Sequence, residues 1–329
     1  MINDTEPSVS SSPPAAFALR AGFSDFDELT RAIEGWGLDW VQLDRGPLEA
    51  QVQQVGSGET LVSRFSFDRK FHQRGTSPPG VRTFGLYGKG SPGLEWRDRE
   101  GRPDEIVVFP SNDEFDAVSQ PGFFGDTVSV VEDRVRAVAE ILELPDPLAD
   151  LPVGRELIET DPGLVESMRA SLDAVHEIAF LPGGQTAGAS TWAEGEFELV
   201  ESVVRGIHGR ARSDGPVPDP TFRHRALSRA LDYIDEHAAL APTVEEICRA
   251  SGASWRTLDY AFKDRFDLTP KRYLQAVRLL GVRRELMILQ GAAPVSATAL
   301  RWGFWHMSQF AADYRRTFGE LPSETVRGA

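Results

Sequence analysis

The last hundred residues of the chain contain one helical pattern twice. Two sets of large apolar side chains follow an i, i+4, i+8 spacing, and the second set lies 52 residues after the first: Leu258, Phe262 and Phe266, then Phe310, Tyr314 and Phe318. Residues at this spacing share one face of a helix, so each set predicts a helix with a buried stripe. A tight turn containing Gly252 or Gly303 precedes each stripe.

A short helix is predicted before each of these turns. Thr243 with Glu246 three residues later forms a capping-box pattern, and Gly252 is suited to the left-handed end of that helix. Ser254 then caps the helix that carries the first stripe. Residues 297–302 play the same part before Gly303. Two helices joined by a short Gly turn form a helix-turn-helix, so the pattern predicts two such units.

Charge is divided unequally between the two parts of the chain. The formal net charge is −15, which on its own argues against a polyanionic partner. The Pro- and Gly-rich segment 209–221 is the best candidate linker. Beyond it, residues 222–329 carry 16 Lys and Arg against 12 Asp and Glu, a charge of +4, whereas residues 1–221 carry −19. This asymmetry favours contact between nucleic acid and the C-terminal part.

Residues 222–329 resemble the DNA-binding domain of AraC/XylS-type transcriptional regulators. The resemblance rests on three runs: Ile247, Ser251-Gly252-Ala253-Ser254, Leu258 and Phe262-Lys263; Leu268-Thr269-Pro270, Tyr273-Leu274, Arg278-Leu279 and Arg283; and Ala299-Leu300-Arg301-Trp302-Gly303-Phe304, Ser308-Gln309-Phe310, Tyr314-Arg315-Arg316, Phe318-Gly319 and Leu321-Pro322-Ser323. Two positions depart from the pattern of the family. Thr298 stands where the family usually has a bulky aliphatic residue, and Val282 stands where it usually has alanine. The resemblance implies two helix-turn-helix units held by a central helix from Pro270 to about Leu289, each with its second helix in the major groove of double-stranded DNA.

The face opposite the first buried stripe supplies candidate DNA-binding residues. We expect Arg256 to read a guanine edge and Lys263 to bind phosphate, while ionised Asp259 can accept a hydrogen bond from a cytosine amino group. Tyr260 is suited to a thymine methyl group or a phosphate. Trp255 presses on the sugar-phosphate edge or anchors the turn, and the sequence leaves both readings open.

The second unit offers fewer strong base readers. Gln309 could pair with adenine, Met307 and Ala312 offer apolar contact, and Arg301, Arg315 and Arg316 are suited to the DNA backbone. The remaining candidates on this face are His306 and Ser308. We therefore expect the first unit to supply specificity and the second to supply mainly affinity.

The region before the linker changes from strands to helices. Short runs rich in Val, Phe, Tyr and Trp between about 38 and 131 predict an antiparallel sandwich or barrel, similar to a jelly roll or cupin. Three helical apolar stripes follow, near 135–142, 164–178 and 197–207; they are core, or one or both of the later two form a dimer surface. The predicted fold is thus α+β and multidomain: a disordered tail over 1–16, a β-rich cupin-like regulatory domain with helices over 17–150, a helical dimerisation or connector segment over 151–208, the linker over 209–221, and an all-α double helix-turn-helix domain over 222–329.

Composition excludes several other classes. The single cysteine, Cys248, rules out a disulfide framework, and His72 alone in the strand region is too few ligands for a cupin metal site. We expect neither a metal nor a cofactor, and no catalytic residue. No apolar run reaches membrane-spanning length, and the acidic N-terminus lacks a signal peptide, so we expect a cytoplasmic protein that does not bind membranes.

The sequence leaves the role of the N-terminal region open. Arg64, Phe84, Trp96 and Phe109 are candidate pocket residues that nothing separates from core positions. The expected protein is a bacterial sequence-specific transcriptional regulator, gated by an unidentified small-molecule effector or by homodimerisation, with RNA polymerase as a further candidate partner. The alternatives are a pure oligomerisation or protein-interaction module with no small-molecule ligand in place of the effector domain, and a cupin-type enzyme fused to a DNA-binding domain.

Overall fold

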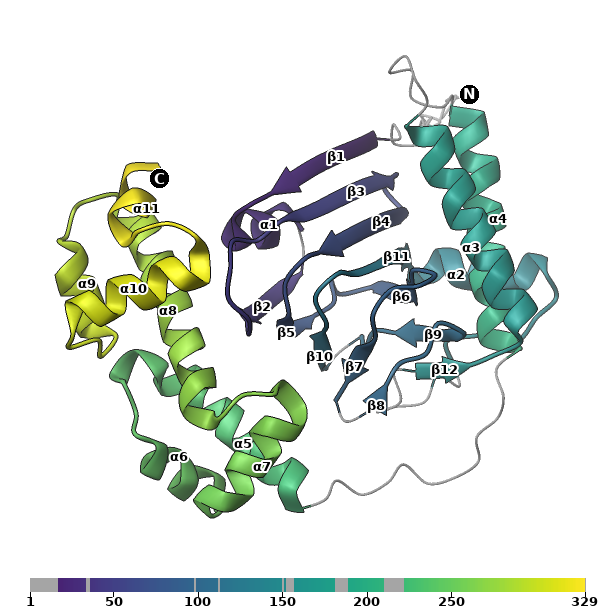
Figure 1. The fold of residues 1–329 in the computed structure, drawn as a ribbon. Coiled ribbons are helices and arrows are strands. Elements are labelled where there is room, and N and C mark those ends of the chain that lie inside the picture. The colour runs from purple at the N-terminus through teal and green to yellow at the C-terminus, as the bar shows by residue number, and fades with distance from the viewer. Residues whose placement is uncertain are drawn as a thin grey trace, which may run out of the picture.

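The computed structural model describes residues 17–33, 36–97, 99–111, 113–149, 151, 157–180, 189–209 and 222–328. The predicted tail over 1–16 and nearly all of the predicted linker over 209–221 lie outside these ranges. Within them, the structure has a β-rich N-terminal part and a C-terminal part made of helices (Figure 1). The α+β class predicted from the sequence is confirmed. Among the described residues, no helix combines the length and the apolar character needed to cross a membrane.

Two antiparallel sheets form the N-terminal part. The seven-stranded sheet has the order β1 (Phe17–Phe23), β3 (Ala50–Gly56), β4 (Thr60–Phe67), β11 (Phe123–Val131), β6 (Val81–Tyr87), β9 (Glu105–Val108) and β12 (Leu157–Glu159). The five-stranded sheet has the order β2 (Gly37–Gln42), β5 (Phe71–Thr76), β10 (Glu114–Ser119), β7 (Leu94–Trp96) and β8 (Arg99–Glu100). Between β1 and β2 lies α1 (Phe26–Ala32), whose first turn is capped by the Asp25 carboxylate.

The seven-stranded sheet is buried on both faces. Between the two sheets lies an aromatic core that includes Trp40, Phe67, Phe71, Trp96 and Phe115. On its other face the sheet packs against three helices, α2 (Glu132–Ile141), α3 (Pro162–Ala179) and α4 (Ala189–His208) (Figure 1).

The two later apolar stripes predicted from the sequence lie in this second core, where Met168, Leu172, Val200 and Val204 are buried. Strand β12 also joins the sheet, by pairing with β9. The described residues of the predicted connector segment, 151–208, therefore pack on the β-rich region. The boundary at residue 150 between these two predicted domains stays a prediction.

Seven α-helices form the described C-terminal part. They are α5 (Phe222–His237), α6 (Val244–Ser251), α7 (Trp255–Phe266), α8 (Pro270–Leu289), α9 (Val295–Arg301), α10 (Met307–Phe318) and α11 (Pro322–Gly328), with a 3₁₀ turn over Ala238–Leu240. One apolar cluster holds α5, α6, α7 and the first half of α8 together. A second cluster holds the last half of α8 with α9, α10 and α11.

The N-terminal and C-terminal parts share apolar packing. Val41 and Val118 of the five-stranded sheet, with Leu43 directly after β2, belong to the cluster of the first helical unit. In the other direction, Leu280 of α8 is buried in the aromatic core of the sandwich. The central helix therefore lies against the sheet rather than standing free of it (Figure 1).

Candidate nucleic-acid interface

The first helix-turn-helix is α6 and α7. The Thr243 hydroxyl accepts from the Glu246 N–H at 3.2 Å while the Glu246 carboxylate accepts from the Thr243 N–H at 2.7 Å, so the predicted capping box is present. Gly252 ends α6 with φ of 67°, a conformation that costs glycine little. Ser254 caps α7 by accepting from the Thr257 N–H at 3.2 Å. These local signals fix the turn that orients α7.

The second helix-turn-helix is α9 and α10. Phe310 and Tyr314 are fully enclosed, and the Tyr314 hydroxyl hydrogen-bonds Thr325 Oγ1 of α11 at 2.7 Å. Phe318 completes the stripe at the rim, with its ring 4.6 Å from that of Tyr314. The repeat read from the sequence thus corresponds to two units, and α8 connects them through its two ends.

The structure places the predicted DNA-binding residues on two exposed helix faces. On α7, Trp255, Arg256, Tyr260 and Lys263 are exposed, and Asp259 is partly buried. On α10, or immediately before it, the exposed predicted residues are His306, Ser308, Gln309, Ala312, Arg315 and Arg316. Met307 is partly buried there, and Arg301 is exposed at the end of α9.

Several of these side chains already have partners within the protein. Lys263 Nζ donates to Asp259 Oδ2 at 2.8 Å, so the predicted phosphate ligand and the predicted cytosine reader form one ion pair. The guanidinium of Arg256 lies 6.0 Å from the centre of the Tyr260 ring. Arg316 pairs with Asp313, and Gln309 Nε2 donates to the same carboxylate at 3.0 Å. DNA would have to compete for these groups.

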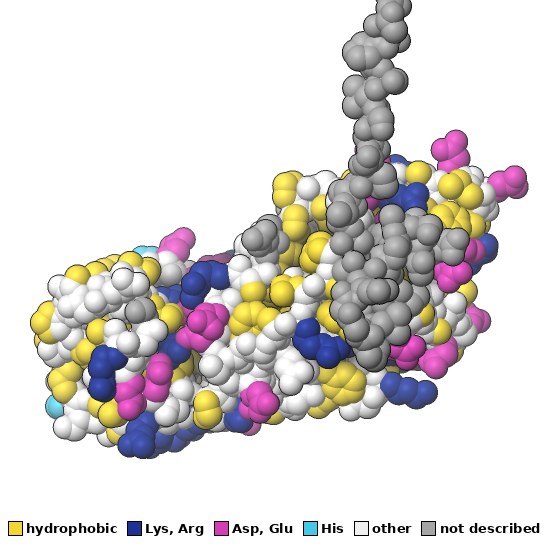
Figure 2. Space-filling view, turned by 90° about the horizontal axis from the view of Figure 1, so that it is seen from above, with side chains coloured by type: hydrophobic (Ala, Val, Ile, Leu, Met, Phe, Trp, Pro, Cys, Tyr) yellow, Lys and Arg dark blue, Asp and Glu magenta, His cyan; other side chains and the backbone are white. Residues whose placement is uncertain are grey.

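Trp305 is also exposed, but it was not among the predicted DNA-binding residues. Its side chain is 74% exposed and comes directly before His306, the N-cap residue of α10. The available signal was a tryptophan in the turn directly before the second helix of the unit. In Figure 2 basic and acidic side chains are interspersed over the helical part.

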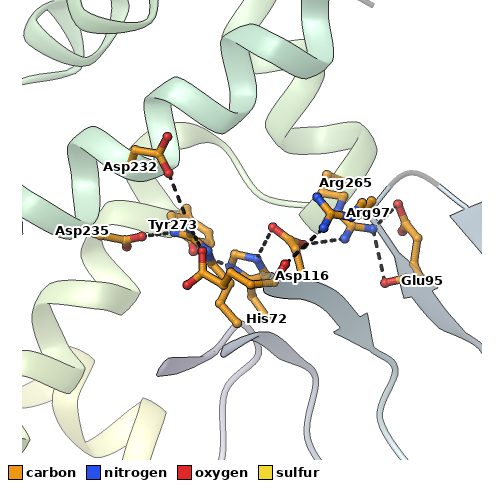
Figure 3. Close-up of polar contacts among 10 residues, drawn as sticks. His72, Glu95, Arg97, Asp116, Asp232, Asp235, Arg265 and Tyr273 are labelled. Atoms are coloured by element: carbon orange, nitrogen blue, oxygen red, sulfur yellow. Dashed lines mark hydrogen bonds and ion pairs between the residues drawn. The ribbon is translucent and has the colours of Figure 1, made fainter. Parts of the chain in front are cut away.

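A polar network joins the first unit to the five-stranded sheet (Figure 3). His72 of β5 is buried, and its Nδ1 lies 2.5 Å from the Tyr273 hydroxyl of α8. Its Nε2 lies 3.3 Å from Asp116 Oδ2 of β10. Arg265 of α7 donates to the other oxygen of Asp116 at 2.7 Å and pairs with Glu95 at 2.5 Å. The sequence predicted that His72 packs or faces solvent, and the structure shows it packed between the two parts of the protein.

The network favours the charged form of Asp116. Burial by itself opposes that form, but His72 and Arg265 outweigh it, so the pKa of Asp116 lies well below its ordinary value. Nearby, Arg74 of β5 pairs with Asp232 and Asp235 of α5. Burial raises the pKa of Asp235 to about 7, although Arg74 opposes the rise.

A second set of ion pairs holds α8 to the region around α1. Arg283 Nε donates to Asp25 Oδ2 at 3.1 Å, and Arg284 Nε donates to Asp27 Oδ1 at 2.9 Å. Carboxylates of the acidic N-terminal part therefore pair with arginines of the basic C-terminal part.

A small cavity lies inside the β-sandwich. Its walls are mostly aromatic, include both Trp96 and Phe109 from the candidate pocket set, and also carry the polar side chains of Gln73 and Thr127. Its volume of about 30 Å³ holds one or two water molecules. Phe84 instead faces the helix-covered core, and Arg64 pairs with Asp126 at 2.7 Å.

These observations define a protein of the double helix-turn-helix class, and comparison with known proteins agrees. A helix-turn-helix domain family matches residues 247–328. The chain is 32% identical over 193 residues to the probable thc operon regulatory protein of Rhodococcus erythropolis, a match covering 56% of this chain and 54% of that protein. It is 32% identical over 130 residues to XylDLEGF operon transcriptional activator 2 of Pseudomonas putida, covering 39% of this chain and 78% of the activator.

The chain belongs to the AraC/XylS-type family of transcriptional regulators. The match spans about half the length of the Rhodococcus relative. Among solved structures, the AraC-like transcriptional activator CuxR is similar with a TM-score of 0.43 and 15% identity, covering 81% of this chain and 94% of that one.

Proposed function

We propose that this protein is a sequence-specific transcriptional regulator that lays α7 and α10 in the major groove of double-stranded DNA. The observation that carries the proposal is a pair of helix-turn-helix units on one central helix, each leaving its second helix exposed on the face opposite its buried stripe. The proposed role is binding rather than catalysis, and its place is the cytoplasm.

The two helices are proposed to have different roles, base reading for α7 and mainly backbone contact for α10. On α7, Arg256 is the guanine reader, because its guanidinium is exposed and can make two parallel hydrogen bonds to a base edge. Lys263 contacts phosphate once its ion pair with Asp259 opens, which frees that carboxylate for a cytosine amino group. On α10, the arginines Arg315 and Arg316 contribute mainly backbone contacts.

Arg256→Ala should relax base specificity, whereas Arg316→Ala should weaken binding to all sequences alike. A bidentate base contact is worth about 1–3 kcal/mol of discrimination, so Arg256→Ala should bring the preferred site and its single-base variant within a few-fold of each other. Arg316→Ala should preserve their affinity ratio and reduce the dependence of binding on salt. Fluorescence anisotropy with both duplexes at several salt concentrations measures this. Equal loss of discrimination in the two variants would contradict the division.

The N-terminal part is proposed to regulate DNA binding through an effector or through a homodimer, and RNA polymerase is the proposed downstream partner. Aromatic walls with a few polar groups are typical of small-molecule sites, and the cavity beside Trp96 has that lining, although occupation by anything larger than water requires it to widen. A thermal-shift screen on the full chain, with analytical ultracentrifugation at matched concentrations, separates an effector-binding domain from a pure oligomerisation module.

A further inference from the structure

Two side chains from one edge of the β-sandwich reach the C-terminal ends of both exposed second helices. Lys70 Nζ donates to the carbonyl oxygen of Phe266, the last residue of α7, at 3.1 Å. Gln42 Nε2 donates to the carbonyl oxygen of Thr317, in the last turn of α10, at 3.2 Å. A single structural element of the N-terminal part therefore contacts both units, each in the last turn of its second helix.

Helix ends of this kind need such donors. The last four carbonyl groups of an α-helix have no partner within the helix, and they carry the negative end of the helix dipole. The ammonium group of Lys70 satisfies one of these carbonyls and also complements the dipole. The Gln42 amide is buried, and its Nε2 also lies 3.1 Å from the Asp44 carbonyl and 2.8 Å from the Gly46 carbonyl, so its two N–H groups are shared among three acceptors.

The two donors belong to one fixed piece of backbone, here named the β2–β5 corner and defined as Gln42, Leu43, Asp44, Lys70 and Phe71. Gln42 is paired with Phe71 in the ladder between β2 and β5. The Leu43 N–H donates to the Lys70 carbonyl at 2.9 Å, and the Lys70 N–H donates to Asp44 Oδ1 at 3.1 Å. The backbone at the two donor residues is therefore held by the end of the β2–β5 ladder and by these hydrogen bonds.

The corner occupies one side of a hollow between the two units. This hollow has a volume of about 450 Å³, and the end of α7, the first turns of α8 and the last half of α10 line its other sides. The central helix α8 is held to the N-terminal part at two places, by the contact of Tyr273 with His72 of β5 and by the pair of Arg283 with Asp25, the N-cap residue of α1. The corner thus lies between the two units and contacts both of them.

We propose that the β2–β5 corner sets the separation of α7 and α10, so that the N-terminal part determines which spacing between two DNA target segments is bound. This inference rests on the proposed function. Gln42 and Lys70 are positioning residues in it, since they contact the far ends of the helices and not the reading face. One base pair advances the duplex by about 3.4 Å, so a fixed pair of helices tolerates little change in spacing.

The test compares spacing preference, not affinity alone. In vitro selection first identifies the duplex that the full chain binds most tightly. The affinity of the chain is then measured for duplexes with one base pair inserted or deleted between the two contacted segments. The wild-type protein should lose at least about tenfold in affinity on either change. The double variant Gln42→Ala, Lys70→Met should bind the best duplex less tightly and lose no more than about threefold on either change.

Matched variants separate positioning from general damage. Lys70→Arg keeps a cationic donor and should keep the wild-type spacing ratio. Lys89→Met removes an exposed lysine of the same part, 3.9 Å from Glu166, and should also keep it. If the double variant does not fold, the single Lys70→Met variant takes its place, because the Lys70 side chain is only partly buried. This variant should also show a weaker dependence of affinity on spacing than the wild-type protein.

The outcomes are distinct. Wild-type protein that binds no DNA sequence selectively overturns the proposed function and this inference with it. Wild-type protein that shows the spacing preference, together with corner variants that keep the same ratio, overturns the inference and leaves the proposed function in place. A weaker dependence of affinity on spacing in the corner variants, with the wild-type dependence kept in Lys70→Arg and Lys89→Met, supports the inference.

Discussion

Asp116→Ala should lower the free energy of unfolding by about 3 kcal/mol, because it removes the carboxylate shared by His72 and Arg265 between the two parts of the protein. Both of those partners are buried, so they would lose a charge partner without gaining water. The value lies at the lower end of the range for a broken buried ion pair, since Glu95 still pairs with Arg265. Urea unfolding followed by tryptophan fluorescence at pH 7 measures it.

The control for Asp116 is a carboxylate in an exposed ion pair. Asp133 lies 3.1 Å from Arg136 and is almost fully exposed, so Asp133→Ala should cost less than about 1 kcal/mol. Folding lowers the pKa of Asp116, so its contribution is fully present above the ordinary pKa of 3.8 and is lost as the pH falls below that value. Equal effects of the two alanine variants at pH 7 would contradict the assigned role of the network.

Phe262→Ala should lower the free energy of unfolding by about 3–5 kcal/mol and abolish DNA binding. Phe262 is fully buried, and its ring lies 5.5 Å from that of Phe266 and 5.4 Å from that of Tyr273. The cavity left by the ring would remove the contact that holds α7 against α8. Urea unfolding and fluorescence anisotropy with the selected duplex measure the two effects.

Tyr260→Ala is the matched control for Phe262, because it removes an aromatic ring two residues earlier on the same helix. The Tyr260 side chain is 56% exposed, so this variant should change stability by less than about 0.5 kcal/mol. It should nevertheless reduce affinity for DNA. A large loss of stability in Tyr260→Ala would mean that the buried and reading faces of α7 have been assigned the wrong way round.

Local sequence signals were sufficient for the helical part. The capping box at Thr243, the turn at Gly252 and the repeated apolar stripes act within a few residues, so they are readable from spacing alone. The ion pair between Asp259 and Lys263 was also readable in principle, because residues four apart on a helix are neighbours. The sequence interpretation treated the two residues separately.

The strands that contact other layers were harder to predict. Strand β5, whose sequence is Phe71-His72-Gln73-Arg74-Gly75-Thr76, lacks the usual alternation because the C-terminal helices cover its outer face, where His72 meets Tyr273. Strand β12 has only three residues and is defined by its partner β9. Contacts such as Arg265 with Asp116, 149 residues apart, leave no local signal at all.

In vitro selection of DNA bound by the full chain tests whether both helix-turn-helix units contact one DNA site. We expect a site with one strongly enriched segment, bound by α7, and a second, more weakly enriched segment centred about one helical turn, roughly 34 Å, away. Repeating the selection with Arg256→Ala should remove the preference for one guanine in one segment and leave the other segment intact. Enrichment of no sequence, or of a single segment that Arg256→Ala leaves unchanged, would contradict the proposed binding of DNA by α7 and α10.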